Sequence, residues 1–218
     1  MTPERARDLV LARTTLQSPP VVPELRLHLA DDIDAAWSSL QRELDDGELP
    51  PPFWAFAWLG GQALARYVLD RPDVVMGRCV LDLATGSGLC ALAAARSGAT
   101  QVRAVDVDPV AVAAVGLNAA ETGLTVQAEC RDLLDEPPPA ADVVLAGDVF
   151  YDAAMSARVQ PWLVAAARAG AQVLVGDPTR HYLPRALLTA VTEIDVPTSR
   201  ELEGVERKRV GVYAVGVS

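Results

Sequence analysis

The stretch that decides the fold runs from Cys79 to Asp108 and reads CVLDLATGSGLCALAAARSGATQVRAVDVD. It opens with an apolar run typical of a buried strand, breaks at Thr85-Gly86-Ser87-Gly88, and continues into a small-residue helix. A second apolar run then ends on Asp106. The two glycines permit a tight turn and let backbone approach a ligand, and an acid at the next strand tip can accept both hydroxyls of a ribose. The stretch therefore predicts a site for a nucleoside-bearing cofactor.

Two cofactor classes are compatible with this pattern. Gly86 and Gly88, followed by Ala91, match the dinucleotide fingerprint G-x-G-x-x-A, but a single match of this kind is weak. Asp82 inside the strand end argues against a dinucleotide, because a carboxylate suits a cationic ligand and not a pyrophosphate. The stretch resembles motif I of the Rossmann-like S-adenosylmethionine (SAM) methyltransferases, and VDVDP at 105–109 resembles their second motif. The resemblance implies SAM; a glycine-rich turn without a ligand is the alternative.

Length and composition limit the classes of partner. The chain has 218 residues, half of them hydrophobic, and a formal net charge of −10 without a basic run, which argues against nucleic acid. No apolar stretch reaches the length of a membrane span, so we expect no membrane partner. The N-terminus lacks the apolar core of a signal peptide, and three cysteines without C-x-x-C spacing indicate a cytoplasmic protein with no metal site. Nothing indicates the oligomeric state.

The predicted elements divide the chain into an N-terminal extension, residues 1–49, and a larger α/β domain, residues 50–218. The extension reads as a helix to about residue 16, a short strand at 22–29 and a helix at 34–44. A further helix at 62–69 precedes the glycine stretch. Strands are then expected at 78–83, 101–106, 124–129, 142–147, 171–176, 191–197 and 207–216, and helices at 88–97, 110–121, 153–169 and 183–191.

Alternation of strands and helices builds a mostly parallel sheet with helices on both faces. The last two strands have only a short charged connection, so we expect them to pair as an antiparallel hairpin at one edge. A terminal hairpin on a seven-stranded sheet is typical of the SAM methyltransferases. The fold class predicted is therefore a Rossmann-like SAM methyltransferase fold with an N-terminal helical extension.

In such a sheet the ligand lies across the carboxyl ends of the strands. Acids stand at five expected strand tips, more than the two or three that turns and helix caps explain, namely Asp82, Asp106, Asp132, Asp148 and Asp177. We expect Asp106 to bind the ribose, and Asp132 with Leu133 to bracket the adenine. Asp82 braces the glycine loop or binds the methionine amino group. The other predicted contacts at these tips are Ala84, Thr85, Gly86, Gly88, Val107 and Gly147.

An aromatic segment, PPFWAFAWLGGQ at 51–62, precedes the glycine stretch. Trp54 and Trp58 lie in a loop flanked by proline and glycine, where their rings could cover a sulfonium through cation–π attraction. The alternative is that both pack as a hydrophobic lid. Gln62 opens the next helix and could bind the cofactor carboxylate.

The fourth strand of the sheet is followed by Asp148-Val149-Phe150-Tyr151. Methyl transfer to an amine requires the amine to be held, desolvated and deprotonated. Asp148 can bind an incoming ammonium, while Phe150 and Tyr151 can exclude water and shape a channel. Core packing is the alternative for the two aromatic residues.

Six segments together resemble the seven-β-strand protein-lysine methyltransferases of the methyltransferase-16 group, among them the enzymes that act on the β subunit of electron transfer flavoprotein. They are FWAFAWLGGQALARYVLD, VLDLATGSGLCALAAARSGA, AVDVDPVAVAAVGLNA, GDVFYD, VGDPTRHYLP and VPTSRELEGVERKRVGVYAV. The resemblance implies a SAM-dependent protein-lysine N-methyltransferase with that subunit as substrate. Cys90 replaces the third glycine of G-x-G-x-G, and Leu59 replaces the proline of W-P-G-G, without loss of a ligand atom.

Three alternatives to this function stay open. Bacterial relatives resemble nicotinamide N-methyltransferases, which implies a small-molecule acceptor. The acceptor could instead be another protein, such as a ribosomal protein. The third is a SAM-binding scaffold without catalysis, although the intact Asp148-x-x-Tyr151 element argues against it.

Overall fold

A computed structural model describes residues 1–32, 52–198 and 204–216. Its centre is a sheet of seven strands in the order β5-β4-β3-β6-β7-β9-β8. The strands are β3 (Cys79–Leu83), β4 (Gln101–Asp106), β5 (Gln127–Cys130), β6 (Val143–Gly147), β7 (Gln172–Asp177), β8 (Leu188–Pro197) and β9 (Arg207–Val215). The first five in chain order are parallel, and β9 pairs antiparallel with both β7 and β8. The predicted fold class, including the terminal hairpin, is confirmed.

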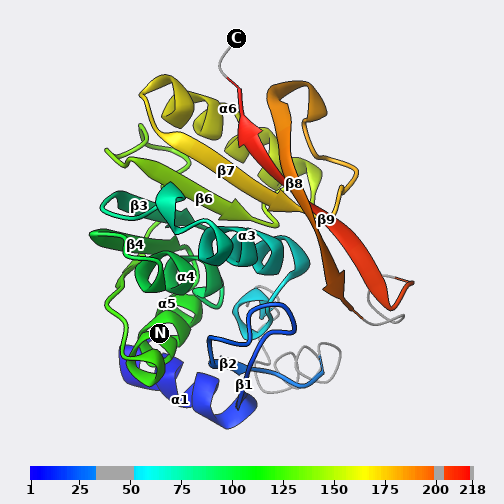
Figure 1. Ribbon diagram of the computed structural model, residues 1–218. Helices are drawn as coiled ribbons and strands as arrows, with labels where there is room; N and C mark the ends of the chain where they lie inside the picture. The colour runs from blue at the N-terminus through cyan, green and yellow to red at the C-terminus, as the bar shows by residue number, and fades with distance from the viewer. Residues whose placement is uncertain (33–51, 199–203, 217–218) are drawn as a thin grey trace.

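Alternate side chains of the strands supply two cores, as the two-residue period of a strand requires. On β3, Val80 belongs to one core and Leu81 to the other. The first core is covered by α3 (Leu59–Asp70), α4 (Leu89–Arg96) and part of α5 (Pro109–Thr122); the second is covered by α6 (Ala153–Arg168). Figure 1 shows these helices on opposite faces of the sheet.

Beside β3, the order in which the chain adds strands to the sheet changes from one side to the other. The chain passes from β3 to β4 and β5 on one side, and returns to β6 and β7 on the other. A crevice opens at the carboxyl ends of the strands where successive crossovers diverge in this way. The order therefore predicts a ligand site at the ends of β3, β4 and β6.

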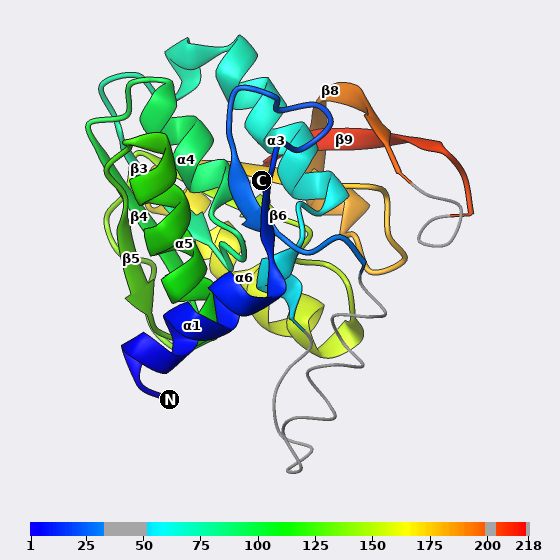
Figure 2. The ribbon, with the colours of Figure 1, turned by 90° about the horizontal axis from the view of Figure 1, so that it is seen from below.

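The N-terminal segment packs directly against the main body. It consists of α1 (Pro3–Arg13) and a two-stranded antiparallel sheet of β1 (Thr15–Gln17) and β2 (Leu27–Leu29). Figure 2 shows α1 lying along α5, with which it shares a small apolar core. The fully buried Asn118 of α5 accepts a hydrogen bond from the backbone of His28 (2.7 Å) and donates one to the carbonyl of Ser87 (2.9 Å). The segment is thus linked to the glycine loop through a single side chain.

Several predicted elements differ from those observed. The predicted helix at 183–191 is wrong: a 3₁₀ turn, η3 (Arg185–Leu187), leads straight into β8. β-branched residues favour a strand here, since Thr189, Val191 and Thr192 lie in a stretch that pairs with β9. The predicted strand at 22–29 shortens to β2, and its partner β1 was not predicted. The helix predicted at 34–44 lies outside the described residues.

Candidate active site

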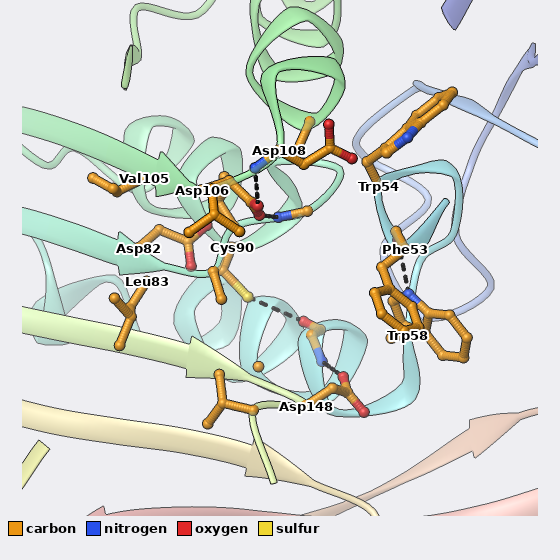
Figure 3. A pocket seen from close by; sticks show the side chains of 18 of the residues that line it. Phe53, Trp54, Trp58, Asp82, Leu83, Cys90, Val105, Asp106, Asp108 and Asp148 are labelled. Carbon is orange, nitrogen blue, oxygen red and sulfur yellow. Dashed lines mark hydrogen bonds between the residues drawn. The ribbon is translucent and has the colours of Figure 1, made fainter. Parts of the chain in front are cut away.

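A cavity of about 440 Å³ opens at the carboxyl ends of β3, β4 and β6. Its floor is formed by the glycine loop and the strand tips, and its rim by the aromatic segment and the loops after β5, β6 and β7 (Figure 3). Cavities of this size hold nucleosides and other small ligands. The predicted site residues that line it are Trp54, Trp58, Asp82, Ala84, Thr85, Gly86, Asp106, Val107, Asp132, Leu133, Gly147, Asp148 and Tyr151.

Three predicted site residues do not line the cavity. Phe150 is only 1% exposed and packs in the core beneath the sheet, so its proposed place in an acceptor channel is corrected to core packing. Gln62 is buried, and its amide donates to the carbonyl of Ala57 (2.7 Å), which turns it away from a cofactor carboxylate. Gly88 caps α4 with φ +82°, and a Cβ there would meet Val115 at 3.0 Å. Its role is conformational.

The glycine loop owes its shape to backbone that only small residues adopt readily. Gly86 has φ +54°, and even Ala84 is held at φ 52°. Such left-handed positions favour glycine because a Cβ crowds the backbone there. Asp82, buried at the end of β3, braces this turn: its Oδ2 accepts from the Thr85 hydroxyl (2.5 Å) and from the Ala91 amide (3.0 Å). Of the two roles expected for Asp82, these hydrogen bonds correspond to the brace.

The burial of Asp82 alters its ionisation. Desolvation raises the pKa of this carboxyl to about 7, against the opposing effect of the hydrogen bonds from Thr85 and Ala91, with a smaller contribution from the charge of Asp106. A group that is half protonated near pH 7 is a weak anchor for a cationic amine. Asp82 is suited to holding the loop.

Asp106 joins the tip of β4 to the glycine loop. Its Oδ2 accepts from the Gly86 amide (2.9 Å) and its Oδ1 from the Asp108 amide (3.0 Å). Burial raises the pKa of Asp106, and the backbone hydrogen bonds partly offset that effect. Each carboxylate oxygen has a second lone pair that can accept from a hydroxyl. The arrangement fits a ribose whose two hydroxyls meet this carboxylate.

The region predicted to bind the adenine contains both apolar and polar side chains. Val107 is 62% exposed and Leu133 is buried, and both contribute apolar surface to the lining of the cavity. Asp132 is already engaged: its Oδ1 accepts from the Leu134 amide (3.0 Å) and its Oδ2 from Arg158 (2.8 Å). The Arg158 partner had no signal in the sequence, since 26 residues separate the pair.

The two tryptophans of the aromatic segment lie differently. Trp54 is buried against α1 and α5 in the small core, and its ring points away from the acids of the cavity floor (Figure 3). Trp58 donates its ring N–H to the carbonyl of Phe53 (2.8 Å), and its ring lies edge-on to Phe53 and Phe56. Trp54 therefore packs as part of a hydrophobic lid, which was the alternative to a cation–π contact. Phe53 and Phe56, which stand in the same aromatic segment, also line the cavity and were not among the predicted site residues.

The backbone at the ends of β6 and β7 lies in direct contact with the backbone at the start of α3. A Cβ on Gly147 would lie 2.9 Å from the Gly61 Cα, and a Cβ on Gly60 would lie 2.1 Å from the Gly176 oxygen. This approach lets the Gly61 amide donate to Asp148 Oδ2 at 2.7 Å (Figure 3). Asp148 itself has φ 57°. Its carboxylate is fixed in orientation by backbone from a distant element.

The second oxygen of Asp148 has a partner that was not among the predicted site residues. Arg180, in the loop after β7, donates from Nη1 to Asp148 Oδ1 and also lines the cavity. The same nitrogen lies 3.8 Å from Oδ2 of the buried Asp177. The signal available was the spacing Asp177-x-x-Arg180 directly after a strand tip.

Tyr151 lies at the mouth of the cavity. It is 45% exposed, and its ring centroid is 5.4 Å from that of Phe53. Desolvation raises the pKa of its hydroxyl, with smaller contributions from the charges of Asp152 and Asp106. The phenol therefore stays protonated near neutral pH, and Tyr151 can pack against a ligand or donate a hydrogen bond.

The residues present fit SAM. Asp106 offers a carboxylate to a ribose, Val107 and Leu133 offer apolar surface to a base, and the backbone of the glycine loop is open to a close ligand. Asp148 and the aromatic rim lie toward the other end of the floor (Figure 3). An acid-lined floor suits a ligand that carries a sulfonium and an ammonium group.

Comparison with known proteins leads to a specific group. The electron transfer flavoprotein β subunit lysine methyltransferase of Rattus norvegicus is 40% identical over 73% of this chain and 62% of its own length. Its counterpart in Mus musculus is 35% identical over 87% of this chain and 76% of its own length. The chain thus spans less than two thirds of the rat protein. The family model of ribosomal protein L11 methyltransferase (PrmA) matches residues 62–149.

Solved structures agree on the fold. The magnesium protoporphyrin IX methyltransferase of Synechocystis PCC 6803, solved with bound SAM, has a TM-score of 0.55 at 15% identity, covering 84% of this chain and 93% of that one. TrmN of Thermus thermophilus has a TM-score of 0.53 at 26% identity, covering 70% of this chain and 48% of that one.

The fold and the glycine-loop cavity are those of the SAM-dependent methyltransferase class, and SAM is the cofactor that the cavity fits. Within that class, the chain belongs to the family of the electron transfer flavoprotein β subunit lysine methyltransferases. Among the described residues, no helix is both long and apolar enough to cross a bilayer.

Proposed function

We propose that this protein transfers methyl groups from SAM to lysine side chains of the electron transfer flavoprotein β subunit. The observation that carries the proposal is the placement of Asp148, whose carboxylate lies in the cofactor cavity beside an aromatic rim. The relative from Mus musculus, named for this activity, matches 87% of the chain.

Methyl transfer to lysine needs a neutral amine in line with the S–CH₃ bond, ~3 Å from the methyl carbon. SAM supplies the methyl group as part of a sulfonium. The N–C bond forms as the C–S bond breaks, and the proton lost by the ammonium passes to solvent. We propose that Asp148 draws in and orients the ammonium, because the Gly61 amide fixes the direction of its carboxylate.

The aliphatic stem of the lysine would lie against the rim. We propose Tyr151 and Phe53 for this contact, since their rings are neighbours and both are partly exposed. Phe53 takes the place first assigned to Phe150. Tyr151 would act by packing or by donating a hydrogen bond, because its raised pKa makes it a poor base.

For the cofactor, we propose that Asp106 binds the ribose and that Val107, Asp132 and Leu133 surround the adenine. The methionine end would lie along the glycine loop and the tip of β6, near Trp58. The residues proposed there are Ala84, Thr85, Gly86 and Gly147, which all line the cavity.

A second candidate is methylation of another protein, such as a ribosomal protein. The family model of ribosomal protein L11 methyltransferase and a relative of that name in Pelobacter propionicus, 37% identical over 71% of this chain, favour it. The family model, however, stops at residue 149, before Tyr151 and Arg180. It covers the cofactor region and little of the acceptor region. A nicotinamide-like acceptor and a non-catalytic scaffold have no such support.

The setting of the reaction is also a proposal. A net charge of −10 favours a basic protein surface over nucleic acid. The three cysteines are free, which suits a reducing compartment such as the cytoplasm. We propose that residues 50–218 form the methyltransferase domain and that residues 1–49 are an N-terminal extension, of which the described part, residues 1–32, packs on that domain.

Labelling of a cell extract tests the function. The protein is incubated with extract and SAM that carries tritium in its methyl group, and the labelled species are identified by gel and mass spectrometry. We expect a single labelled protein, the electron transfer flavoprotein β subunit, with label on lysine. Label found only in dialysable small molecules would reject a protein acceptor.

A further inference from the structure

The guanidinium of Arg180 lies between two carboxylates that end neighbouring strands. Nη1 donates to Asp148 Oδ1 at the tip of β6, and lies 3.8 Å from Asp177 Oδ2 at the tip of β7. The backbone of Arg180 is tied to the same place, because its amide donates to Asp177 Oδ1 (2.7 Å). The side chain is therefore held at the acceptor end of the cavity by its own loop.

The two carboxylates differ in how many of their oxygens have a hydrogen-bond partner. Asp148 has both oxygens engaged, one by the Gly61 amide and one by Arg180. Asp177 is completely buried, yet its Oδ2 has no hydrogen-bond partner among the described residues. A buried carboxylate oxygen without a donor is costly, so a donor that reached it would be stabilised. The Arg180 guanidinium is such a donor, since its Nη1 lies 3.8 Å from this oxygen.

We propose that, in the absence of substrate, the Arg180 guanidinium occupies the position on Asp148 that the substrate ammonium takes. When the lysine arrives, the guanidinium moves to the oxygen of Asp177 that has no hydrogen-bond partner. Arg180 is then a specificity-determining residue, which acts through Asp148. This inference rests on the proposed function, because it takes a lysine as the incoming group.

The exchange has a consequence for selectivity. When a lysine ammonium replaces the guanidinium on Asp148, one cation takes the place of another, and no buried carboxylate is left without a counter-charge. A neutral acceptor such as nicotinamide would have to leave the largely buried Asp148 uncompensated as Arg180 departs, which is unfavourable for a carboxylate with little access to water. The arrangement therefore admits cationic acceptors and disfavours neutral ones.

A double-mutant cycle on Arg180 and Asp177 tests the exchange, with the intact chain and the purified electron transfer flavoprotein β subunit as substrate. Arg180→Gln removes the competing cation, so KM for the protein substrate should fall by roughly three- to ten-fold, the range of one partly buried ion pair. Asp177→Asn weakens the ion pair that Arg180 forms after it moves, so KM should rise by a similar factor. In the double variant, Asp177→Asn should have no effect on KM, because no guanidinium remains to be moved.

Three controls keep the outcome specific. Arg185→Gln removes the same charge from the exposed turn η3, outside the cavity, and corrects for the change in net charge. SAM affinity by calorimetry and Tm by thermal scan exclude loss of folded protein as the cause. Besides these three controls, Arg180→Lys places a primary amine at the occupied position, and we expect SAM to methylate it in the absence of substrate.

The possible results separate the two proposals. Wild-type protein that methylates no protein lysine overturns the proposed function. Wild-type protein that methylates the subunit, with KM unchanged or raised in Arg180→Gln or with additive effects of the two substitutions, overturns the exchange alone. Reduced KM in Arg180→Gln with non-additivity supports it.

Discussion

At the scale of single residues, the site consists of carboxylates with different tasks. Asp106 holds the glycine loop through the Gly86 amide, and Asp82 holds it through the Thr85 hydroxyl. Asp148 instead presents its charge toward the acceptor end. The sequence predicted that these acids stand at strand tips, because strand ends are readable from apolar runs. It did not predict their partners, since Arg158 and Arg180 approach from segments 26 and 32 residues away.

Substitution of Asp106 should separate its two roles. Asp106→Ala removes the ribose acceptor and the loop brace, and we expect SAM affinity to fall by about 1.5–3 kcal/mol. Asp106→Asn keeps one oxygen for the Gly86 amide and loses the charge, so the loss should be smaller. Isothermal titration calorimetry with SAM measures both; equal affinity for wild type and Asp106→Ala would remove Asp106 from the cofactor site.

The pKa of Asp82, raised to about 7, predicts a stability that depends on pH. The unfolded chain has an aspartate pKa of about 3.9, so the folded state binds this proton more tightly, and unfolding releases it between about pH 4 and 7. The contribution of Asp82 to stability therefore falls as pH rises through this window. Asp82→Asn removes the dependence, so Tm of the variant relative to wild type should rise from pH 5 to pH 8. A pH-independent difference would show that the pKa is not raised.

At the scale of elements, the site depends on close backbone packing between α3 and the ends of β6 and β7. The small-residue segment from Gly60 to Gly61 allows it, and the contact delivers the Gly61 amide to Asp148. The sequence predicted α3 and the parallel strands correctly because their periodicities are clear. It mistook the start of β8 for a helix, because a short apolar run after Pro184 has no decisive period.

Two glycine-to-alanine substitutions test this packing. Both Gly60 and Gly116 lie in helices, where alanine is intrinsically favoured by about 0.5–1 kcal/mol. A Cβ at Gly116 meets nothing within 4 Å, but at Gly60 it meets the Gly176 oxygen at 2.1 Å. We expect Gly116→Ala to stabilise the protein and Gly60→Ala to destabilise it by about 1–3 kcal/mol or more in urea unfolding. Equal effects of the two would contradict the close approach.

At the scale of the whole molecule, charge and fold act together. The net charge of −10 is spread over a chain whose strand-tip acids contribute less to the surface field than the sequence suggested. Asp82 and Asp177 are buried, and Asp132 is paired with Arg158. Attraction of a basic protein partner must therefore arise mainly from the overall charge, which acts over the Debye length.

Salt should weaken that attraction. Between about 0.03 and 0.3 M salt the Debye length shrinks from ~18 to ~6 Å, so we expect kcat/KM on a folded protein substrate to fall clearly. The matched control is the rate on a short lysine peptide of zero net charge, which should change little. Salt-independent turnover of the protein substrate would argue against charge steering.

The central claim is that Asp148 directs methyl transfer to lysines of the electron transfer flavoprotein β subunit. The most direct test incubates the purified subunit with SAM and either wild type or Asp148→Asn, followed by peptide mass mapping. We predict methylated lysines with wild type, and a rate lower by about 10²-fold with the variant, whose SAM affinity is preserved. An unmodified subunit, under conditions where the same wild-type protein methylates ribosomal protein L11 or nicotinamide, would contradict the account, as would near-normal turnover by Asp148→Asn.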